Sequence, residues 1–405
     1  SKPVPEANSC KETFYPARLR MMATEQEEAQ AAVVALLAAG AERRIDTHAA
    51  RIFLAGDRAW KLKRAVRYDY LDFSTPEQRH QALEDELRFN RRTAPMLYRA
   101  VHPITDAGGG RLAIGGEGRP VDWVLEMTRF PDGALLAEQE TLSGDLMLRL
   151  ADSIAAFHAA AEIGPRGGGA ARFARVVEGN VVSLQAQAAI LDPARVARLA
   201  TELRRAVATG SAVLDARAEA GRVRHVHGDL HLANIALVDG APIAFDCLEF
   251  DSELATIDTL YDLAFLLMDL WQRGWRNAAN ILFNRYLDLT AADEGGLALM
   301  PLFLAVRAAI RAHVMAAQGK PGDAAASLDL ALALLRDETP RLVAIGGLSG
   351  SGKSTLARAI GGAVGRAPGA RVLRSDVLRK RIAGLLPEQR LPTAAYTADA
   401  NAAVY

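Results

Sequence analysis

Cysteine is scarce in this 405-residue sequence, and neither sign of charge is in excess. The only two cysteines, Cys10 and Cys247, are too few for a disulfide scaffold or a four-thiolate zinc site, which fits a reducing compartment. Lysine plus arginine and aspartate plus glutamate both total 48, so no basic excess indicates a nucleic-acid or anionic-membrane partner. The sequence therefore argues against disulfide scaffolds and polybasic proteins.

No apolar run is long enough and free enough of charge to predict a transmembrane helix. The stretch 254–271 contains three aspartates, and the run 296–306 is short and closes on an arginine. The Ala-rich stretch 29–41 follows acidic residues where a signal peptide needs positive charge. We therefore expect a cytoplasmic protein with no membrane partner.

Half of the residues are hydrophobic and 24% are charged, which is typical of a globular protein. At about 150 residues per domain, the length predicts two or three domains. The patterning divides the chain into an unpatterned, flexible tail over 1–28, a strand-rich part over 29–128, a mostly helical part over 129–337 and a last part over 338–405.

Periodicity and turn signals predict the elements of each part. Apolar periodicity predicts helices over 29–39, 75–92, 142–161, 184–208, 257–270, 277–289, 298–317 and 324–335. Short β-like runs cover 51–55, 59–66, 121–127, 234–238, 243–245, 342–345 and 371–373. Thr75-Pro76 is a helix start signal.

A glycine-rich segment near the C-terminal end fits a nucleotide-binding loop. G-L-S-G-S-G-K-S-T, residues 347–355, matches G-x-x-x-x-G-K-[ST] between a predicted strand and a predicted helix. Its glycines would let backbone N–H groups converge on phosphates, Lys353 would reach the terminal phosphates and Ser354 would ligate magnesium. The candidate nucleotide-binding residues are Gly347, Gly350, Gly352, Lys353, Ser354 and Thr355. The alternative is an accidental glycine-rich turn.

Asp376 follows the predicted strand 371–373, where the carboxyl end of a strand opens into a ligand crevice. The stretch R-S-D-V-L-R-K resembles the small-molecule kinases of the P-loop class, which implies that Asp376 and Arg379 meet the phosphate acceptor. A solvated aspartate at a helix start is the alternative. A doubly wound domain needs roughly twice the length that follows the linker, so we expect an incomplete P-loop domain.

The segment H-V-H-G-D-L-H-L-A-N-I, residues 225–235, carries the most specific pattern. Asp229 and Asn234 are five residues apart, the spacing by which a kinase catalytic loop holds its base and its metal-binding amide. Asp246 follows twelve residues later at a strand end, so two oxygen ligands from adjacent turns could clamp magnesium. This spacing favours phosphoryl transfer.

Two alternatives account for the histidines of this segment. His225, His227, Asp229 and His231 resemble the H-x-H-x-D zinc cluster of metal-dependent hydrolases, but Leu230 stands where that pattern expects a histidine. A turn with satisfied histidines is the other alternative.

H-G-D-L-H-x-x-N, followed by F-D and Y-D-L-A (261–264), resembles the aminoglycoside phosphotransferase and choline kinase branch of the protein-kinase-like fold. The order of the modules resembles bacterial proteins that fuse two kinases. The resemblance implies an α+β bilobal protein-kinase-like fold followed by an incomplete α/β P-loop domain. It also implies that Asp229 is the catalytic base, that Asn234 and Asp246 bind Mg²⁺, and that Asp262 supports the catalytic loop.

The same resemblance implies a lysine that binds ATP. Of the seven lysines in the chain, Lys61 and Lys63 lie on one face of a predicted strand. Ala59-Trp60-Lys61 matches the kinase A-x-K pattern, so Lys61 is the first choice for binding ATP and Lys63 the second. A partner carboxylate would come from Glu84 or Glu86, and the resemblance favours Glu86. An exposed hairpin that happens to carry lysines is the alternative.

Two further features concern nucleotide binding in the first part. Met127 to Phe130 would form the hinge whose backbone groups contact adenine. No G-x-G-x-x-G loop precedes Lys61, which departs from the kinase pattern.

We therefore expect an ATP- and Mg²⁺-dependent phosphotransferase acting on a hydroxyl of a small molecule, with no nucleic-acid partner. The competing class is a non-catalytic nucleotide-binding or regulatory protein. Aminoglycosides, choline-like amines, sugars and protein side chains all remain open as acceptors. Glu249, Asp251 and Glu253 could favour a cationic acceptor, although a solvated turn is the stronger expectation.

Overall fold

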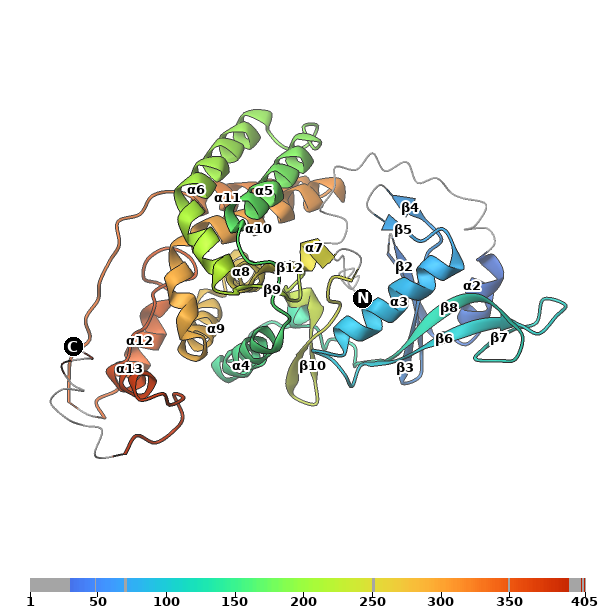
Figure 1. Ribbon diagram of the computed structural model, residues 1–405, viewed down its shortest axis with the longest axis horizontal. Coiled ribbons are helices and arrows are strands. Elements are labelled where there is room, and N and C mark those ends of the chain that lie inside the picture. Colours follow the sequence, from blue (N-terminus) through green and yellow to red (C-terminus); the bar gives the residue numbers. More distant parts are fainter. Residues whose placement is uncertain are drawn as a thin grey trace.

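The computed structural model describes residues 30–47, 49–68, 71–249, 252–348 and 350–392, together with residues 402 and 404. The described chain forms a strand-rich N-lobe, a helical C-lobe and a C-terminal segment that lies beside the C-lobe (Figure 1). The predicted tail over 1–28 lies outside the described residues.

An antiparallel sheet forms the centre of the N-lobe. Its strand order in the described chain is β1-β2-β3-β8-β6-β7, and each neighbouring pair is antiparallel. The strands are β1 (Arg43–Asp46), β2 (Ala50–Ala55), β3 (Arg58–Lys63), β6 (Tyr98–Asp106), β7 (Leu112–Ile114) and β8 (Arg119–Thr128). β4 (Arg67–Tyr68) and β5 (Leu71–Asp72) form a separate small pair. The sequence predicted β2, β3 and β8 and missed β1 and β6.

Each face of this sheet packs against one helix. Because strand side chains alternate, Val124 and Leu125 of β8 point to opposite faces. Val124 packs with α2 (Ala31–Ala39), and Leu125 packs with α3 (Pro76–Asn90). α3 begins as predicted, because the Thr75 hydroxyl accepts from the Gln78 amide while the Gln78 side chain accepts from the Thr75 amide.

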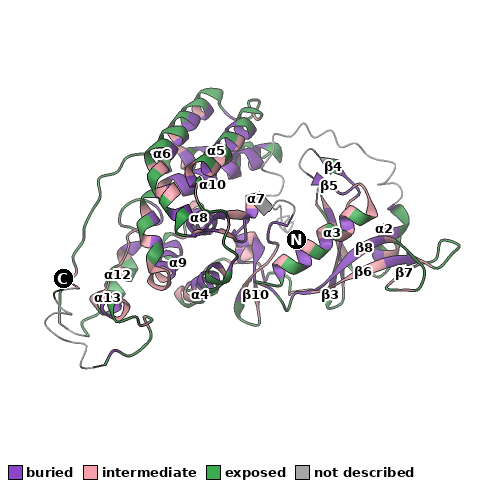
Figure 2. Cartoon of the chain, in the orientation of Figure 1, coloured by how far each residue is buried: buried purple, intermediate pink, exposed green. Residues whose placement is uncertain are grey.

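The C-lobe is built around two buried helices, α8 and α10. Every residue of α8 from Thr259 to Leu270 is buried, and the purple ribbon of Figure 2 marks this core. The helices of the lobe are α4 (Gly144–Ala160), α5 (Gly169–Gln185), α6 (Pro193–Glu219), α7 (Ser252–Ala255), α8 (Thr259–Gln272), α9 (Arg276–Leu289), α10 (Met300–Ala317) and α11 (Pro321–Leu334). Three 3₁₀ helices, η2 (Leu136–Glu138), η3 (Leu232–Asn234) and η4 (Ala291–Leu299), complete the helical part.

Two short strand pairs hold the loops of the C-lobe that carry Asp229, Asn234 and Asp246. β9 (Val223–His225) pairs with β12 (Thr256–Asp258), and β10 (Ile235–Val238) pairs with β11 (Ala241–Ala244). Both pairs are antiparallel. The segment between β9 and β10 is therefore anchored at each end.

The single helix predicted over 184–208 is wrong. The chain forms α5 up to Gln185, turns, and begins α6 at Pro193. The Asp192 side chain accepts from the Ala194 amide, so Asp192-Pro193 is a helix start that interrupts the apolar periodicity.

The C-terminal segment contains α12 (Lys353–Gly361) and α13 (Ser375–Ile382). The strands predicted over 342–345 and 371–373 are wrong, since the structure describes both stretches without strand pairing. Leu342 is 96% exposed and Leu373 is 60% exposed, which a buried parallel strand would not be. Figure 2 draws the chain between α11 and α12 mostly as exposed.

One stretch in the described part of the chain, Ala291–Ala317, is long and apolar enough to cross a membrane by length and composition. Of its most apolar window, 78% is buried inside the fold. Leu304 and Ile310, which are 0% exposed, belong to the C-lobe core.

Candidate active site

Lys61 of β3 meets carboxylates from both lobes. Its Nζ lies 2.5 Å from Glu86 Oε1 on α3 and 3.0 Å from Asp246 Oδ1 after β11. Burial opposes the charge of Lys61, but Asp246 and Glu86 outweigh burial and raise its pKa. The structure therefore brings a buried, charged ammonium group to the junction of the lobes.

Lys63 occupies the same face and forms a second ion-pair set. Its Nζ lies 2.6 Å from Glu86 Oε2 and 2.8 Å from Glu249 Oε1. Glu86 thus bridges both lysines, whereas Glu84 is exposed and pairs with His80. Of the two lysines, Lys61 is the one that contacts Asp246, and Lys63 is engaged by two glutamates.

The expectation of a solvated turn after Asp246 is wrong at Glu249. The Glu249 side chain is 2% exposed because it pairs with Lys63. Asp251 lies outside the described residues, as does the side chain of Glu253.

Asp229 and Asn234 lie together between β9 and β10. Asn234 Nδ2 donates to Asp229 Oδ2 and to the Asp229 carbonyl, both at 3.0 Å. Burial would raise the pKa of Asp229, but the nearby His231 ring, whose Nε2 is 3.6 Å from Oδ2, helps to hold it at about 2. Asp229 is therefore a buried carboxylate that stays ionised at neutral pH.

The β10–β11 pair places Asn234 and Asp246 at one end of a hairpin. Ile235 lies opposite Ala244, so the residues just before β10 and just after β11 are neighbours. Asp246 has a φ of 61°, an uncommon value for a residue other than glycine. The Tyr98 hydroxyl accepts from the Asp246 amide at 3.1 Å, and Asn90 Oδ1 accepts from the Cys247 amide at 2.8 Å.

Asp262, at the start of α8, holds the loop between β9 and β10. Its carboxylate accepts from the amides of His227 at 3.3 Å and Gly228 at 2.9 Å. His158 Nε2 contacts Asp262 Oδ2 at 3.0 Å, and His158 Nδ1 contacts the Tyr286 hydroxyl at 2.9 Å. No sequence pattern singled out His158, Tyr286, Tyr98 or Asn90, because each contacts residues far away in the chain.

The histidines of the loop do not form a zinc cluster. His225 packs against the Phe89 ring, and His227 Nε2 contacts the Phe245 carbonyl at 3.0 Å. His231 lies against the Phe265 ring. No group of three or more His, Cys, Asp or Glu side chains with metal-binding geometry occurs in the part of the chain that the structure describes. The geometry therefore argues against the hydrolase alternative.

Met127 lies within β8, opposite Ala59 of β3 and Tyr98 of β6. Two amides of the predicted hinge already have partners. The Thr128 amide donates to the Leu97 carbonyl, and the Arg129 amide donates to the Asp57 carbonyl, both at 2.8 Å. In this structure these two amides are therefore not available to the adenine contacts that the sequence predicted for the hinge.

The glycine-rich loop lies in the C-terminal segment. Gly350 and Gly352 have φ values of 77° and 83°, and Gly352 precedes α12, which begins at Lys353. Lys353 Nζ donates to the Leu348 carbonyl at 2.5 Å. Ser354 and Thr355 are exposed in the first turn of α12.

Asp376 lies in the first turn of α13 and pairs with Lys380 at 3.0 Å. A cavity of about 1150 Å³ has Gly347, Gly350, Lys353, Ser354 and Asp376 among its lining residues. The structure thus brings four of the six predicted P-loop residues and Asp376 to one cavity, which Gly352 and Thr355 do not line. The predicted strands that flank them are absent from the described segment.

A lysine–glutamate pair in a small β lobe and an aspartate–asparagine loop in a helical lobe define a protein-kinase-like phosphotransferase fold. Comparison with known families agrees. The model of the phosphotransferase enzyme family matches residues 46–299, and the model of an AAA domain matches residues 342–405. The chain belongs to this phosphotransferase family and carries a P-loop domain of the AAA type at its C-terminal end.

Related proteins extend over most of the chain. Uncharacterized proteins of Mycobacterium tuberculosis and Mycobacterium bovis are each 34% identical over 351 residues, which is 83% of this chain and 68% of the relative. Among solved structures, an apo thermostable mutant of aminoglycoside phosphotransferase APH(4)-Ia is 15% identical with a TM-score of 0.45, covering 72% of this chain and 93% of that chain. Glucosamine kinase is 17% identical with a TM-score of 0.45, covering 73% and 74%.

Proposed function

We propose that the first two lobes form an ATP- and Mg²⁺-dependent phosphotransferase that transfers the γ-phosphoryl group to a hydroxyl of a small molecule. The contact of Lys61 with both Glu86 and Asp246 carries this proposal, because it places a charged lysine from one lobe beside a candidate metal ligand from the other. We propose domain boundaries near residues 128 and 337, and a cytoplasmic location.

The residues present fit a magnesium ion. Asn234 and Asp246 offer amide and carboxylate oxygens at the same end of the β10–β11 hairpin, and the positive φ of Asp246 turns the chain at this point. Magnesium bound by these two residues would neutralise charge on the phosphates.

Each residue of the site has a distinct proposed role. Lys61, held by Glu86, would bind phosphate oxygens of ATP and stabilise the charge that develops during transfer. Asp229 is ionised, so it can orient the acceptor hydroxyl and take its proton as the phosphoryl group leaves ATP. Asn234 would fix the Asp229 carboxylate through its 3.0 Å hydrogen bond.

Substitution of Asp246 and Asp229 tests this proposal. Asp246→Ala should abolish magnesium-dependent turnover, and Asp229→Asn should lower kcat by about 10²- to 10⁴-fold, because it removes the base. The measurement is ATP consumption with a panel of aminoglycosides, sugars and amino alcohols. Glu84→Gln, on the exposed face of α3, is the control and should keep parental activity.

If turnover persists in the Asp246→Ala variant, the metal assignment is wrong. If the parent binds ATP but forms no phosphorylated product with any acceptor, the non-catalytic alternative is supported instead.

For the C-terminal segment we propose a second nucleotide site. Gly347, Gly350, Gly352 and Thr355 would shape the loop, Lys353 would bind the terminal phosphates, and Ser354 would ligate magnesium. Asp376, on the wall of the same cavity, would face the phosphate acceptor. In the described structure Lys353 contacts the Leu348 carbonyl, so it would have to turn toward the phosphates.

A further inference from the structure

The C-terminal segment contacts helix α9 through its main chain. Asn284 Nδ2 donates to the Ala370 carbonyl at 3.0 Å, and Asn284 Oδ1 accepts from the Val372 amide at 2.6 Å. The two backbone groups flank Arg371 on one edge of the chain. A single asparagine amide thus supplies the two hydrogen bonds that a neighbouring β-strand would supply.

Asn280, one turn earlier on α9, binds the same stretch of main chain. Its Nδ2 donates to the carbonyls of Pro368 at 3.1 Å and Ala370 at 2.9 Å. Asn280 is 1% exposed, so its amide is committed to this contact. Since unpaired buried amides are costly, Asn280 fits a surface that is normally covered.

Three glycines allow the two parts to approach this closely. A Cβ added at Gly361 would lie 2.2 Å from Asn280 Oδ1, and one at Gly369 would lie 2.7 Å from Asn280 Nδ2. A Cβ added at Gly362 would lie 2.8 Å from the Arg276 carbonyl. No other residue type fits these positions without movement.

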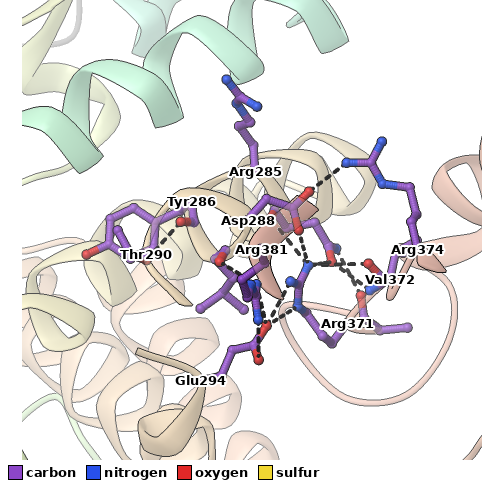
Figure 3. Close-up of polar contacts among 12 residues, drawn as sticks. Arg285, Tyr286, Asp288, Thr290, Glu294, Arg371, Val372, Arg374 and Arg381 are labelled. Atoms are coloured by element: carbon purple, nitrogen blue, oxygen red, sulfur yellow. Dashed lines mark hydrogen bonds and ion pairs between the residues drawn. The ribbon is translucent and has the colours of Figure 1, made fainter. Parts of the chain in front are cut away.

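Ion pairs accompany the asparagine contacts, and Figure 3 shows Arg371, Arg374 and Arg381 near Asp288 and Glu294. Arg371 lies 2.8 Å from both Asp288 and Glu294, and Arg374 lies 2.8 Å from Asp288. Arg381 lies 3.0 Å from Glu294. Burial would raise the pKa of Glu294, but hydrogen bonds from Arg381 and Arg371 lower it. Arginines of the C-terminal segment therefore meet acids of the C-lobe.

We propose that a docking surface on the C-lobe, which we define as Asn280, Asn284 and Asp288 of α9 together with Glu294 of η4, is built to hold the P-loop module of the same chain. The P-loop module is the C-terminal segment that carries the glycine-rich loop, α12 and α13. Arg374 immediately precedes α13, which carries Asp376. Arg371 and Arg374 line the same cavity as Lys353 and Asp376, so docking fixes part of the wall of that cavity and the P-loop module depends on the C-lobe for its nucleotide site. This second part of the inference rests on the proposed nucleotide binding by the P-loop.

Two variants of the full chain test the docking from opposite sides. Gly361→Val places a side chain against Asn280, and Asn284→Leu removes both hydrogen bonds to the main chain. Gly179→Val is the matched control, because this glycine of α5 has no atoms within 4 Å of an added Cβ. Hydrogen exchange of the peptide containing Val372 should become at least about tenfold faster in both variants and stay parental in the control.

The dependence of the nucleotide site on docking is tested by measuring ATP binding. The relevant quantity is the part of the ATP binding that is lost when Lys353 is replaced by Ala. Both docking variants should weaken it severalfold. Unchanged exchange at Val372 in both variants would overturn the docking. Faster exchange with unchanged Lys353-dependent binding would overturn the dependence of the cavity on α9. If the parent shows no Lys353-dependent binding, the nucleotide proposal fails together with that dependence, while exchange still decides the docking.

Discussion

At the residue scale, Glu86 forms ion pairs with both lysines of β3. Its two carboxylate oxygens each hold one lysine, and each lysine holds one acid of the segment after β11. Lys61 contacts Asp246, the proposed metal ligand, whereas Lys63 contacts Glu249. The side chains of Lys63 and Glu249 are each only 2% exposed, so their pair is a buried structural link between the lobes.

Replacement of Lys63 should therefore reduce mainly stability, and replacement of Lys61 should reduce mainly activity. Lys63→Met leaves Glu86 and Glu249 without one buried counter-charge and should destabilise the fold by about 3–5 kcal/mol. Lys61→Met should have its main effect on ATP use, raising KM or lowering kcat. Denaturant unfolding and steady-state kinetics of both variants measure the difference. A larger kinetic loss in a well-folded Lys63→Met protein would exchange the two assignments.

At the element scale, α9 makes contacts in two directions. Asn280 and Asn284 contact the C-terminal segment, while the Tyr286 hydroxyl contacts His158, which in turn contacts Asp262. Asp262 then accepts hydrogen bonds from the amides of His227 and Gly228 in the proposed catalytic loop. The helix thus connects the P-loop module, through these contacts, with the proposed phosphotransferase site.

Removal of one hydroxyl tests the contact between α9 and His158. Tyr286→Phe deletes the 2.9 Å contact with His158, so Asp262 and the loop that it holds should be less well oriented. We expect kcat to fall severalfold with an unchanged KM for ATP. Thr290→Val, which removes a 2.8 Å bond at the end of the same helix, is the control and should leave kcat unchanged. Equal effects of both variants would indicate a general loss of helix stability.

At the scale of the whole molecule, the large C-lobe core makes stability depend on pH. His313 of α10 is 4% exposed and contacts Asn180 Oδ1 of α5 at 3.1 Å. Burial lowers its pKa to about 3. Between this value and the ordinary 6.5, the unfolded chain takes up a proton that the folded chain does not.

The fold should therefore lose stability as the pH falls from about 6.5 toward 3, by at most about 1.4 kcal/mol per pH unit from this histidine. His313→Gln, whose amide can still donate to Asn180, should show a shallower decline. Denaturant unfolding at pH 7.5 and pH 5 measures both slopes. Parallel slopes in the two proteins would mean that His313 does not titrate on unfolding.

The sequence predicted local features well, because their cause is local. Asp229 and Asn234 lie within one loop. Asp246 follows a hairpin of two short strands, so it comes to lie at the same end of the hairpin as Asn234, twelve residues earlier. The start of α3 was likewise readable from Thr75-Pro76. The kinase-like fold class was predictable because several such local patterns occur in the expected order.

Tertiary structure alone decided the long-range partners. Lys61 and Asp246 are separated by 185 positions. The A-x-K pattern made Lys61 the first choice, but only the packed fold shows that Lys61 contacts Asp246 while Lys63 contacts Glu249. The burial of Glu249 and the contacts of His158 depend in the same way on side chains from other elements. The stretch 371–373 has the composition of a strand, but Asn284 takes one edge of its backbone and no strand forms there. Backbone hydrogen bonds must be satisfied, and only the packed fold determines which groups satisfy them.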